Sequence, residues 1–312
     1  MIKVLSGFKA RAAGLWHVIR NTAINWNESD PWRQSAILAY YSIFSLPALL
    51  LIIIVIAGYF FGEEAVSREL SAQIATLIGN DTARAVENMV ASAAQIGSST
   101  TAMLVGIGFL LFGSTSVFYH LQLSLNRIWG VVPRPKQAFL KYLKDRLLSF
   151  GLVLVIGFLL MLSLIVTTLL AIFGDWIRQF WPEIILPMLN LASYLLSLLI
   201  TTILFALMFK ILPDAIIRWR SVWVGALLTA ILFSLGQYGL SVYFRISEPA
   251  TVYGTAGAII LILIWASYVA MILLFGAEFT RQWAKKFGHG IKPKENARLM
   301  EDDSESYQII NE

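Results

Sequence analysis

Six stretches of this 312-residue chain contain no Asp, Glu, Lys or Arg, and each is close to or above the length of a bilayer-crossing helix. A helix needs about 20 predominantly apolar residues to cross the hydrocarbon core of a membrane. The chain is 58% hydrophobic and only 14% charged, whereas a soluble domain is about 45–50% apolar. The sequence therefore predicts an all-α, polytopic membrane protein with six transmembrane helices and additional amphipathic interfacial helices. We expect the spans at about residues 37–59, 102–119, 147–173, 184–209, 222–244 and 253–277.

The basic residues predict the orientation of these spans. With the N-terminus inside the cell, all but four of the 24 Lys and Arg residues fall on the inner side. Cations are retained on the cytoplasmic side during insertion, so both termini are expected to be cytoplasmic. The same asymmetry accounts for the net charge of +5 without a nucleic-acid partner, because a nucleic-acid site would gather its cations on one face. The four exceptions are Arg68, Arg84, Arg178 and Arg245.

Two segments outside the spans have an amphipathic pattern. Apolar residues between Val4 and Ile19 recur on one helical face, which predicts a helix over residues 2–26 lying on the inner leaflet. On the outer side, residues 63–96 divide near Asn80 into two amphipathic pieces. This segment is expected to form an outer helical hairpin.

The remaining segments set the domain boundaries. The second span is expected to continue as a helix to Trp129 and to break at Gly130 and Pro133. Residues 1–287 are predicted to form one six-span membrane domain. Because residues 288–312 are polar, we expect them to be a disordered cytoplasmic tail. The first residues lack the apolar core of a cleaved signal peptide, so none is expected to be removed.

The first span has one polar stripe in an otherwise apolar helix. Gln34, Tyr41 and Ser45 fall within about 40° of one another at 100° per residue. Pro47 frees the carbonyl of Ile43, which must find a partner in protein or water because lipid offers none. We therefore expect the inner half of this helix to face protein or a cavity, and the outer half to face lipid.

Three further spans carry polar stripes, whereas the third and fourth are mostly Leu, Ile and Val and are expected to be peripheral. Such stripes commonly serve close helix packing, so packing and a solute pathway both stay open. Glu278 has two interpretations, an interfacial charge beside Arg281 or a functional carboxylate, and His120 is either a packing residue or a proton carrier. The stripes comprise Gly106, Gly113, His120 and Ser124 in the second span, Ser234, Gln237, Tyr238 and Ser241 in the fifth, and Tyr253, Gly257, Tyr268 and Glu278 in the sixth.

The sequence carries no recognisable catalytic motif. It has no cysteine, which excludes disulfides and thiolate metal sites. Its histidines, His17, His120 and His289, lie far apart, and neither an HExxH motif nor a glycine-rich phosphate loop occurs. We therefore expect no enzyme activity, no catalytic residues, no metal site and no cofactor.

Four blocks of the sequence resemble the YihY/virulence factor BrkB family of bacterial inner-membrane proteins. They are "SAILAYYSIFSLPALLLII" at residues 35–53, "GSTSVFYHLQLSLNRIWGV" at 113–131, "KILPD" at 210–214 and "YGTAGAIILILIWASYVAMILLFGAEFTR" at 253–281. The resemblance implies a six-span protein of the inner membrane, often described as a transporter or envelope protein, with relatives linked to lipid or lipopolysaccharide export. Members also carry the older name ribonuclease BN, which the absence of a nuclease motif does not support.

Residues and resemblance together favour a transporter or a flippase-like exporter of a lipid-like or small polar solute. A non-transporting envelope scaffold is the alternative, and a ribonuclease is a distant third. The expected partners are the lipid bilayer and a lipid or small-solute substrate, with no nucleic acid, and a homo-oligomer stays open. The candidate pathway or gating residues are Gln34, Tyr41, Ser45, Pro47, His120, Asn126, Arg127, Gln237, Tyr253, Gly254, Gly257, Tyr268 and Glu278.

Overall fold

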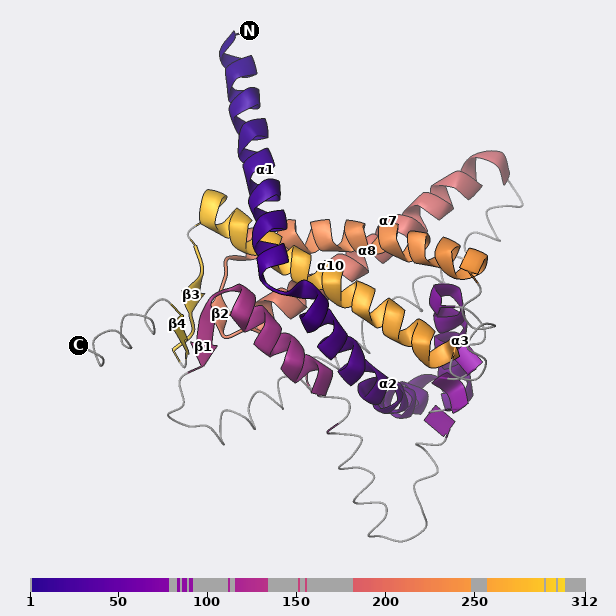
Figure 1. Ribbon diagram of the computed structural model, residues 1–312. Helices are drawn as coiled ribbons and strands as arrows, with labels where there is room; N and C mark the ends of the chain where they lie inside the picture. Colours follow the sequence, from indigo (N-terminus) through magenta and orange to yellow (C-terminus); the bar gives the residue numbers. More distant parts are fainter. Residues whose placement is uncertain are drawn as a thin grey trace, which may run out of the picture.

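The computed structural model is helical, with two small antiparallel strand pairs at one end (Figure 1). Its helices are α1 (Ile2–Glu28), α2 (Pro31–Phe61), α3 (Glu63–Ile78), α7 (Pro182–Ile211), α8 (Trp219–Ser247) and α10 (Gly257–Phe287). Residues 116–128 are also helical. The structure describes residues 2–78, 83–84, 86–88, 90–91, 112, 116–133, 151, 155, 182–247, 257–288, 290–295 and 297–300.

Within the described residues, four helices are long and apolar enough to cross a membrane. They coincide with the predicted first, fourth, fifth and sixth spans. Most of the predicted second span and nearly all of the third lie outside the described residues. The four candidate spans are Pro31–Val55, Leu191–Ile211, Trp219–Phe244 and Ile259–Phe287.

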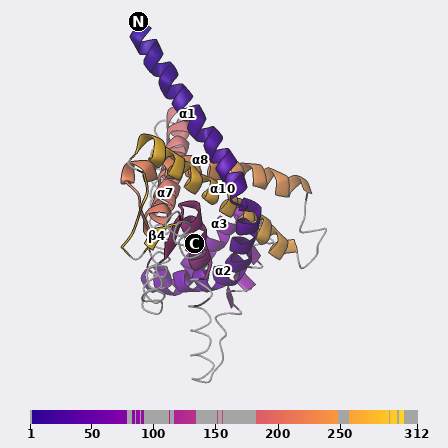
Figure 2. The same ribbon diagram turned by 60° about the vertical axis from the view of Figure 1, so that its left-hand side comes forward.

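Helix α10 lies at the centre of the described bundle. It packs against α1, α2 and α8, while α7 packs on the far side of α8 and α3 packs against α2. Figures 1 and 2 both show the N-terminal part of α1 extending beyond the other helices. Leu15 and Ile19, on the predicted apolar face of α1, are 42% and 41% exposed. That face is therefore available to a membrane surface.

Local chemistry explains where α2 begins and ends. Pro31 occupies its first turn, where a missing N–H costs no helical hydrogen bond. Gly62 follows with φ 88° and donates its N–H to the Gly58 carbonyl, a conformation that a glycine adopts without a steric penalty. Between them α2 continues as one helix through Pro47.

Helices α8 and α10 approach closely through a reciprocal pair of small residues. A Cβ atom added to Gly225 would overlap the Thr280 hydroxyl, and one added to Gly276 would overlap the Thr229 hydroxyl. Both hydroxyls donate to carbonyls of their own helices, Thr229 to Gly225 and Thr280 to Gly276, each at 2.7 Å. Small residues at spacing four are a common means of bringing membrane helices together.

The predicted outer hairpin is helical in its described part and covers α2. Residues 83–84, 86–88 and 90–91 are helical, as is α3 before them. Leu70 and Ile74 of α3 pack with Val86 against Leu50 of α2. Ile53 is also buried, against Val66 of α3. We had expected the outer half of α2 to face lipid, but one side of it packs against protein.

The C-terminal segment is structured, which corrects the predicted disorder from residue 288. Strand β1 (Val131–Pro133) pairs with β4 (Ala297–Leu299), and β2 (Ala215–Ile216) pairs with β3 (Lys292–Pro293). Residues 292–299 thus tie the turn after the 116–128 helix to the loop after α7. Backbone pairing with distant segments overrides the polar composition of these residues. Residues 301–312 lie outside the described part.

Candidate functional site

A buried carboxylate marks the polar region where α1, α2 and α10 meet. Glu278 is only 2% exposed, and α10 continues past it to Phe287. The predicted span ended at residue 277, so the sequence placed Glu278 too near the helix end. The charge lies inside a helix, among neighbours from other elements.

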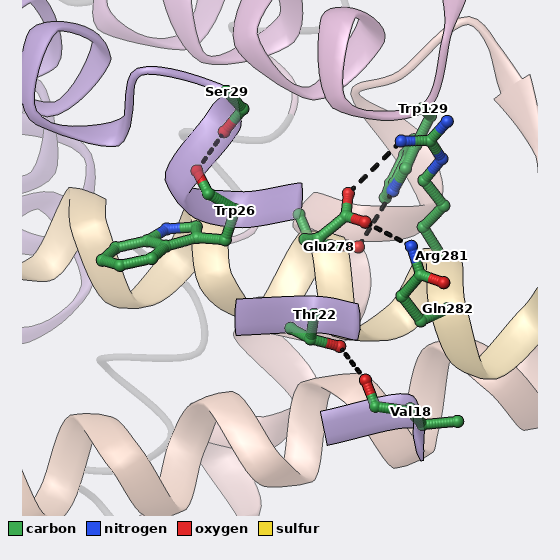
Figure 3. Close-up of polar contacts among 9 residues, drawn as sticks. Val18, Thr22, Trp26, Ser29, Trp129, Glu278, Arg281 and Gln282 are labelled. Carbon is green, nitrogen blue, oxygen red and sulfur yellow. Dashed lines mark hydrogen bonds and ion pairs between the residues drawn. The ribbon is translucent and has the colours of Figure 1, made fainter. Parts of the chain in front are cut away.

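The partners of Glu278 come from α10 and α1. Gln282 donates to one carboxylate oxygen at 2.6 Å, and the Arg281 guanidinium lies 3.5 Å from the other. The Asn25 side chain of α1 lies close to this carboxylate. Figure 3 shows the carboxylate directed toward Arg281 and Gln282, with the Trp129 indole donating nearby to the Ala277 carbonyl at 3.1 Å. The Arg281 guanidinium and the Gln282 amide are therefore the polar partners of the carboxylate.

The same region holds three buried polar atoms without a hydrogen-bond partner in the described structure: Trp26 Nε1, Gln34 Oε1 and Arg281 Nε. Trp26 packs edge-on against Phe275 of α10. Ser29 links the other two helices, because its hydroxyl donates to the Trp26 carbonyl and its carbonyl accepts from Gln34. An unpaired buried polar atom costs about 1–3 kcal/mol, so this region has unused capacity to bind a polar group.

We call this set of residues the polar junction. It comprises Asn25, Trp26, Gln34, Glu278, Arg281 and Gln282.

The polar stripe on the inner half of α2 faces protein, as its helical spacing predicted. Gln34 and Ser45 are 5% and 3% exposed. Tyr41 stacks on His120, with ring centroids 3.7 Å apart and 17° between planes. Ser45 donates to the Ser42 carbonyl of the same helix at 3.3 Å. These residues thus meet other parts of the protein, and much of their polarity is satisfied locally.

Asn126, a candidate pathway residue, forms a buried pair with Asp214. Its amide donates to the Asp214 carboxylate at 2.9 Å and its carbonyl oxygen accepts from the Asp214 backbone N–H at 2.8 Å. Both residues are buried. The pair fastens the end of the 116–128 helix to the loop after α7, whereas the adjacent Arg127 is exposed.

In the described structure, the stripe on α8 is exposed or half-buried. Tyr238 is 73% exposed, and Gln237 is only half-buried. On α10, Tyr268 donates to the Leu232 carbonyl of α8 at 3.4 Å, and Gly257 is buried. Pro47 is half-buried, while Tyr253 and Gly254 lie outside the described residues.

Sequence reasoning missed several members of the polar junction. Asn25 and Trp26 lay in a segment expected to rest on the membrane surface, although helix α1 ends against α10. Gln282 stands four residues after Glu278, one helical turn away, and that spacing could have indicated it. Among the described residues, no group of three His, Cys, Asp or Glu side chains could hold a metal ion.

The sequence profile of the virulence factor BrkB family matches residues 24–300. Among curated proteins, a UPF0761 membrane protein of Saccharophagus degradans is 25% identical over 91% of this chain and 63% of its own length. One of Pseudoalteromonas translucida is 26% identical over 78% of each chain, and one of Alcanivorax borkumensis is 30% identical over 59% of this chain and 41% of its own length.

No solved structure matches the chain. The family match covers the polar junction, the Asn126–Asp214 pair and the strand pairs, and the relatives are named as membrane proteins. The chain is a multi-pass membrane protein and belongs to the virulence factor BrkB (YihY/BrkB) family.

Proposed function

We propose that this protein is a transporter or flippase-like exporter of a lipid-like or small polar solute in the bacterial inner membrane. One observation carries the proposal: α1, α2 and α10, which pack against one another, contribute a buried carboxylate and three buried polar atoms that have no hydrogen-bond partner in the described structure. Ionisable groups within membrane spans are costly and commonly mark solute or proton pathways. A region that only held helices together would gain stability by pairing these atoms.

We propose that the helices move relative to one another at the turn between α1 and α2, which lies between Trp26 and Gln34 in the sequence. The turn between α1 and α2 contains Asp30 in a left-handed conformation, with φ 54°, which is uncommon for a residue other than glycine. The ion pair between Asp30 and Arg33 at this turn has side chains that are about 60% exposed and adds little stability. We propose that the observed packing is a closed state and that α1 and α2 separate from α10 to admit water or solute.

A comparison of lipids and small molecules on both sides of the membrane tests this function. Three strains would be compared by untargeted analysis: one with the wild-type protein, one with the Glu278→Gln variant and one that lacks the protein. We expect at least one compound to change distribution with the wild type and to revert with Glu278→Gln, because the amide keeps the size and removes the charge.

Glu64→Gln is the matched control, because Glu64 is 92% exposed and forms a surface ion pair with Arg68. It should behave as the wild type. Identical compound distributions in all strains, or a Glu278→Gln strain equal to the wild type, would overturn the proposal.

A non-transporting scaffold is the second candidate. The hydroxyls of Ser42, Thr229 and Thr280 all donate to carbonyls of their own helices, which suits permanent close packing. A scaffold would keep the polar junction dry in every state. We further propose that the protein is not an enzyme, so purified protein should not cleave RNA.

A further inference from the structure

A groove with a basic, aromatic end is lined by residues of α7, α8 and the end of α10, none of which belongs to the polar junction. Its apolar part, of about 400 Å³, is lined by Leu195, Leu198, Leu199 and Thr202 of α7 and by Trp223, Val224 and Leu227 of α8. Its basic part, of about 590 Å³, is lined by Arg218, Arg220, Ser221, Trp223 and Val224 of α8 and by Trp283, Phe287 and Gly288 at the end of α10.

Trp223 and Val224 line both parts, so the two spaces lie next to each other. The two parts together are amphipathic, with cations at one end and aliphatic side chains, one threonine and Trp223 at the other. Between Leu195 and Thr202 the apolar part extends about 10 Å along α7, at 1.5 Å per residue.

Several basic groups lie at the same end of these helices. Lys210 donates to the Ile217 carbonyl and lies 5.6 Å from the Trp219 ring. Lys285 and Lys286 occupy the last turn of α10 and are exposed. Tryptophans beside such cations are typical of the level of lipid headgroups at a membrane surface.

We infer that this groove binds an anionic phospholipid, with its phosphate at Arg218 and Arg220 and an acyl chain against Leu195, Leu199 and Leu227. Guanidinium groups bind phosphate through charge-assisted hydrogen bonds. These leucines are 54%, 51% and 45% exposed, respectively. Their side chains carry no polar group, so an acyl chain can cover them without breaking a hydrogen bond. This inference concerns a site separate from the polar junction and does not depend on transport.

The test measures lipid retention by the purified full-length chain with native mass spectrometry. The probes are phosphatidylglycerol and phosphatidylcholine with identical acyl chains. We expect the wild type to prefer phosphatidylglycerol, and Arg218→Gln/Arg220→Gln to lower its affinity about tenfold or more, since each cation near a membrane surface contributes about 1 kcal/mol. Arg20→Gln/Arg33→Gln removes the same charge from exposed positions elsewhere and should leave the preference intact.

The apolar end has its own pair of variants. Leu199→Trp should obstruct the acyl chain and weaken binding, whereas Leu235→Trp, on α8 and 64% exposed but outside the groove, should not. In wild-type protein, excess glycerophosphoglycerol, which lacks acyl chains, should fail to displace the lipid.

Three results would overturn the inference. The wild type could show no preference for phosphatidylglycerol, or the two double-arginine variants could weaken binding equally. Displacement by the acyl-free headgroup would show a phosphate site without a lipid groove. The wild-type measurements decide the matter even if a variant fails to fold.

Discussion

Asn126 and Asp214 exchange two hydrogen bonds across 88 residues of sequence. Asn126 stood out in the sequence as a polar residue beside Arg127, and Asp214 as the end of "KILPD". Neither pattern could indicate that they bond to each other, because the pairing depends on how distant segments pack. In the structure they join the end of the 116–128 helix to the loop after α7, and neither belongs to the polar junction.

Exchanging the two side chains tests this fastening. Asn126→Asp alone places two carboxylates together and should lower the free energy of unfolding by about 1–3 kcal/mol. Asn126→Asp/Asp214→Asn should recover most of that loss, because the carboxylate can accept from the backbone N–H and the amide can donate back. Thermal unfolding in detergent measures both effects, and a double variant no more stable than the single one would contradict the pairing.

At the scale of elements, the contact between α8 and α10 depends on space at Gly225 and Gly276. Gly225→Ala should destabilise the protein by about 1–3 kcal/mol, because the added methyl group overlaps Thr280 in a packed interface. Thr280→Gly in the same chain should restore part of the stability by returning space to the other helix. Thermal unfolding again provides the measurement.

Gly239→Ala is the matched control on α8. Nothing lies within 4 Å of a Cβ added there, so the change should be neutral or stabilising, since alanine favours helix by up to about 1 kcal/mol. If both alanine variants had the same stability, the helices would not be held together at Gly225.

The long helices were predictable, and the strand pairs were not. An uncharged run of about 20 residues specifies a membrane helix through the cost of burying charge, so α2, α7, α8 and α10 match the expected spans. Strands β1 to β4 are at most three residues long, and their stability comes from partners far along the chain. The helical spacing of the polar residues identified the buried face of α2 correctly. For Tyr238 on α8, which is 73% exposed, polarity alone does not say which face meets another helix.

At the scale of the whole molecule, the distribution of basic residues predicts the topology. Reporter tags at residues 1 and 312 should both be cytoplasmic, and a tag near residue 80 should be external. Paired reporters active on opposite sides of the membrane provide the measurement. An external C-terminus would contradict the six-span arrangement.

The central claim is that the polar junction and the inner face of α2 open to water. The chain contains no cysteine, so single cysteines report on their own positions without background. Glu28→Cys, at an exposed position of α1, is the positive control. Ala226→Cys, at a position that is 0% exposed among apolar neighbours, is the control for a dry core.

The deciding measurement is the rate at which a small water-soluble thiol reagent modifies Tyr41→Cys and Ser45→Cys in native membranes. Ser45 is 3% exposed in the closed packing, so its modification requires opening. A transporter predicts that both variants react more slowly than Glu28→Cys and clearly faster than Ala226→Cys. Rates at Tyr41 and Ser45 as low as at Ala226 would contradict transport through this region and would favour the scaffold.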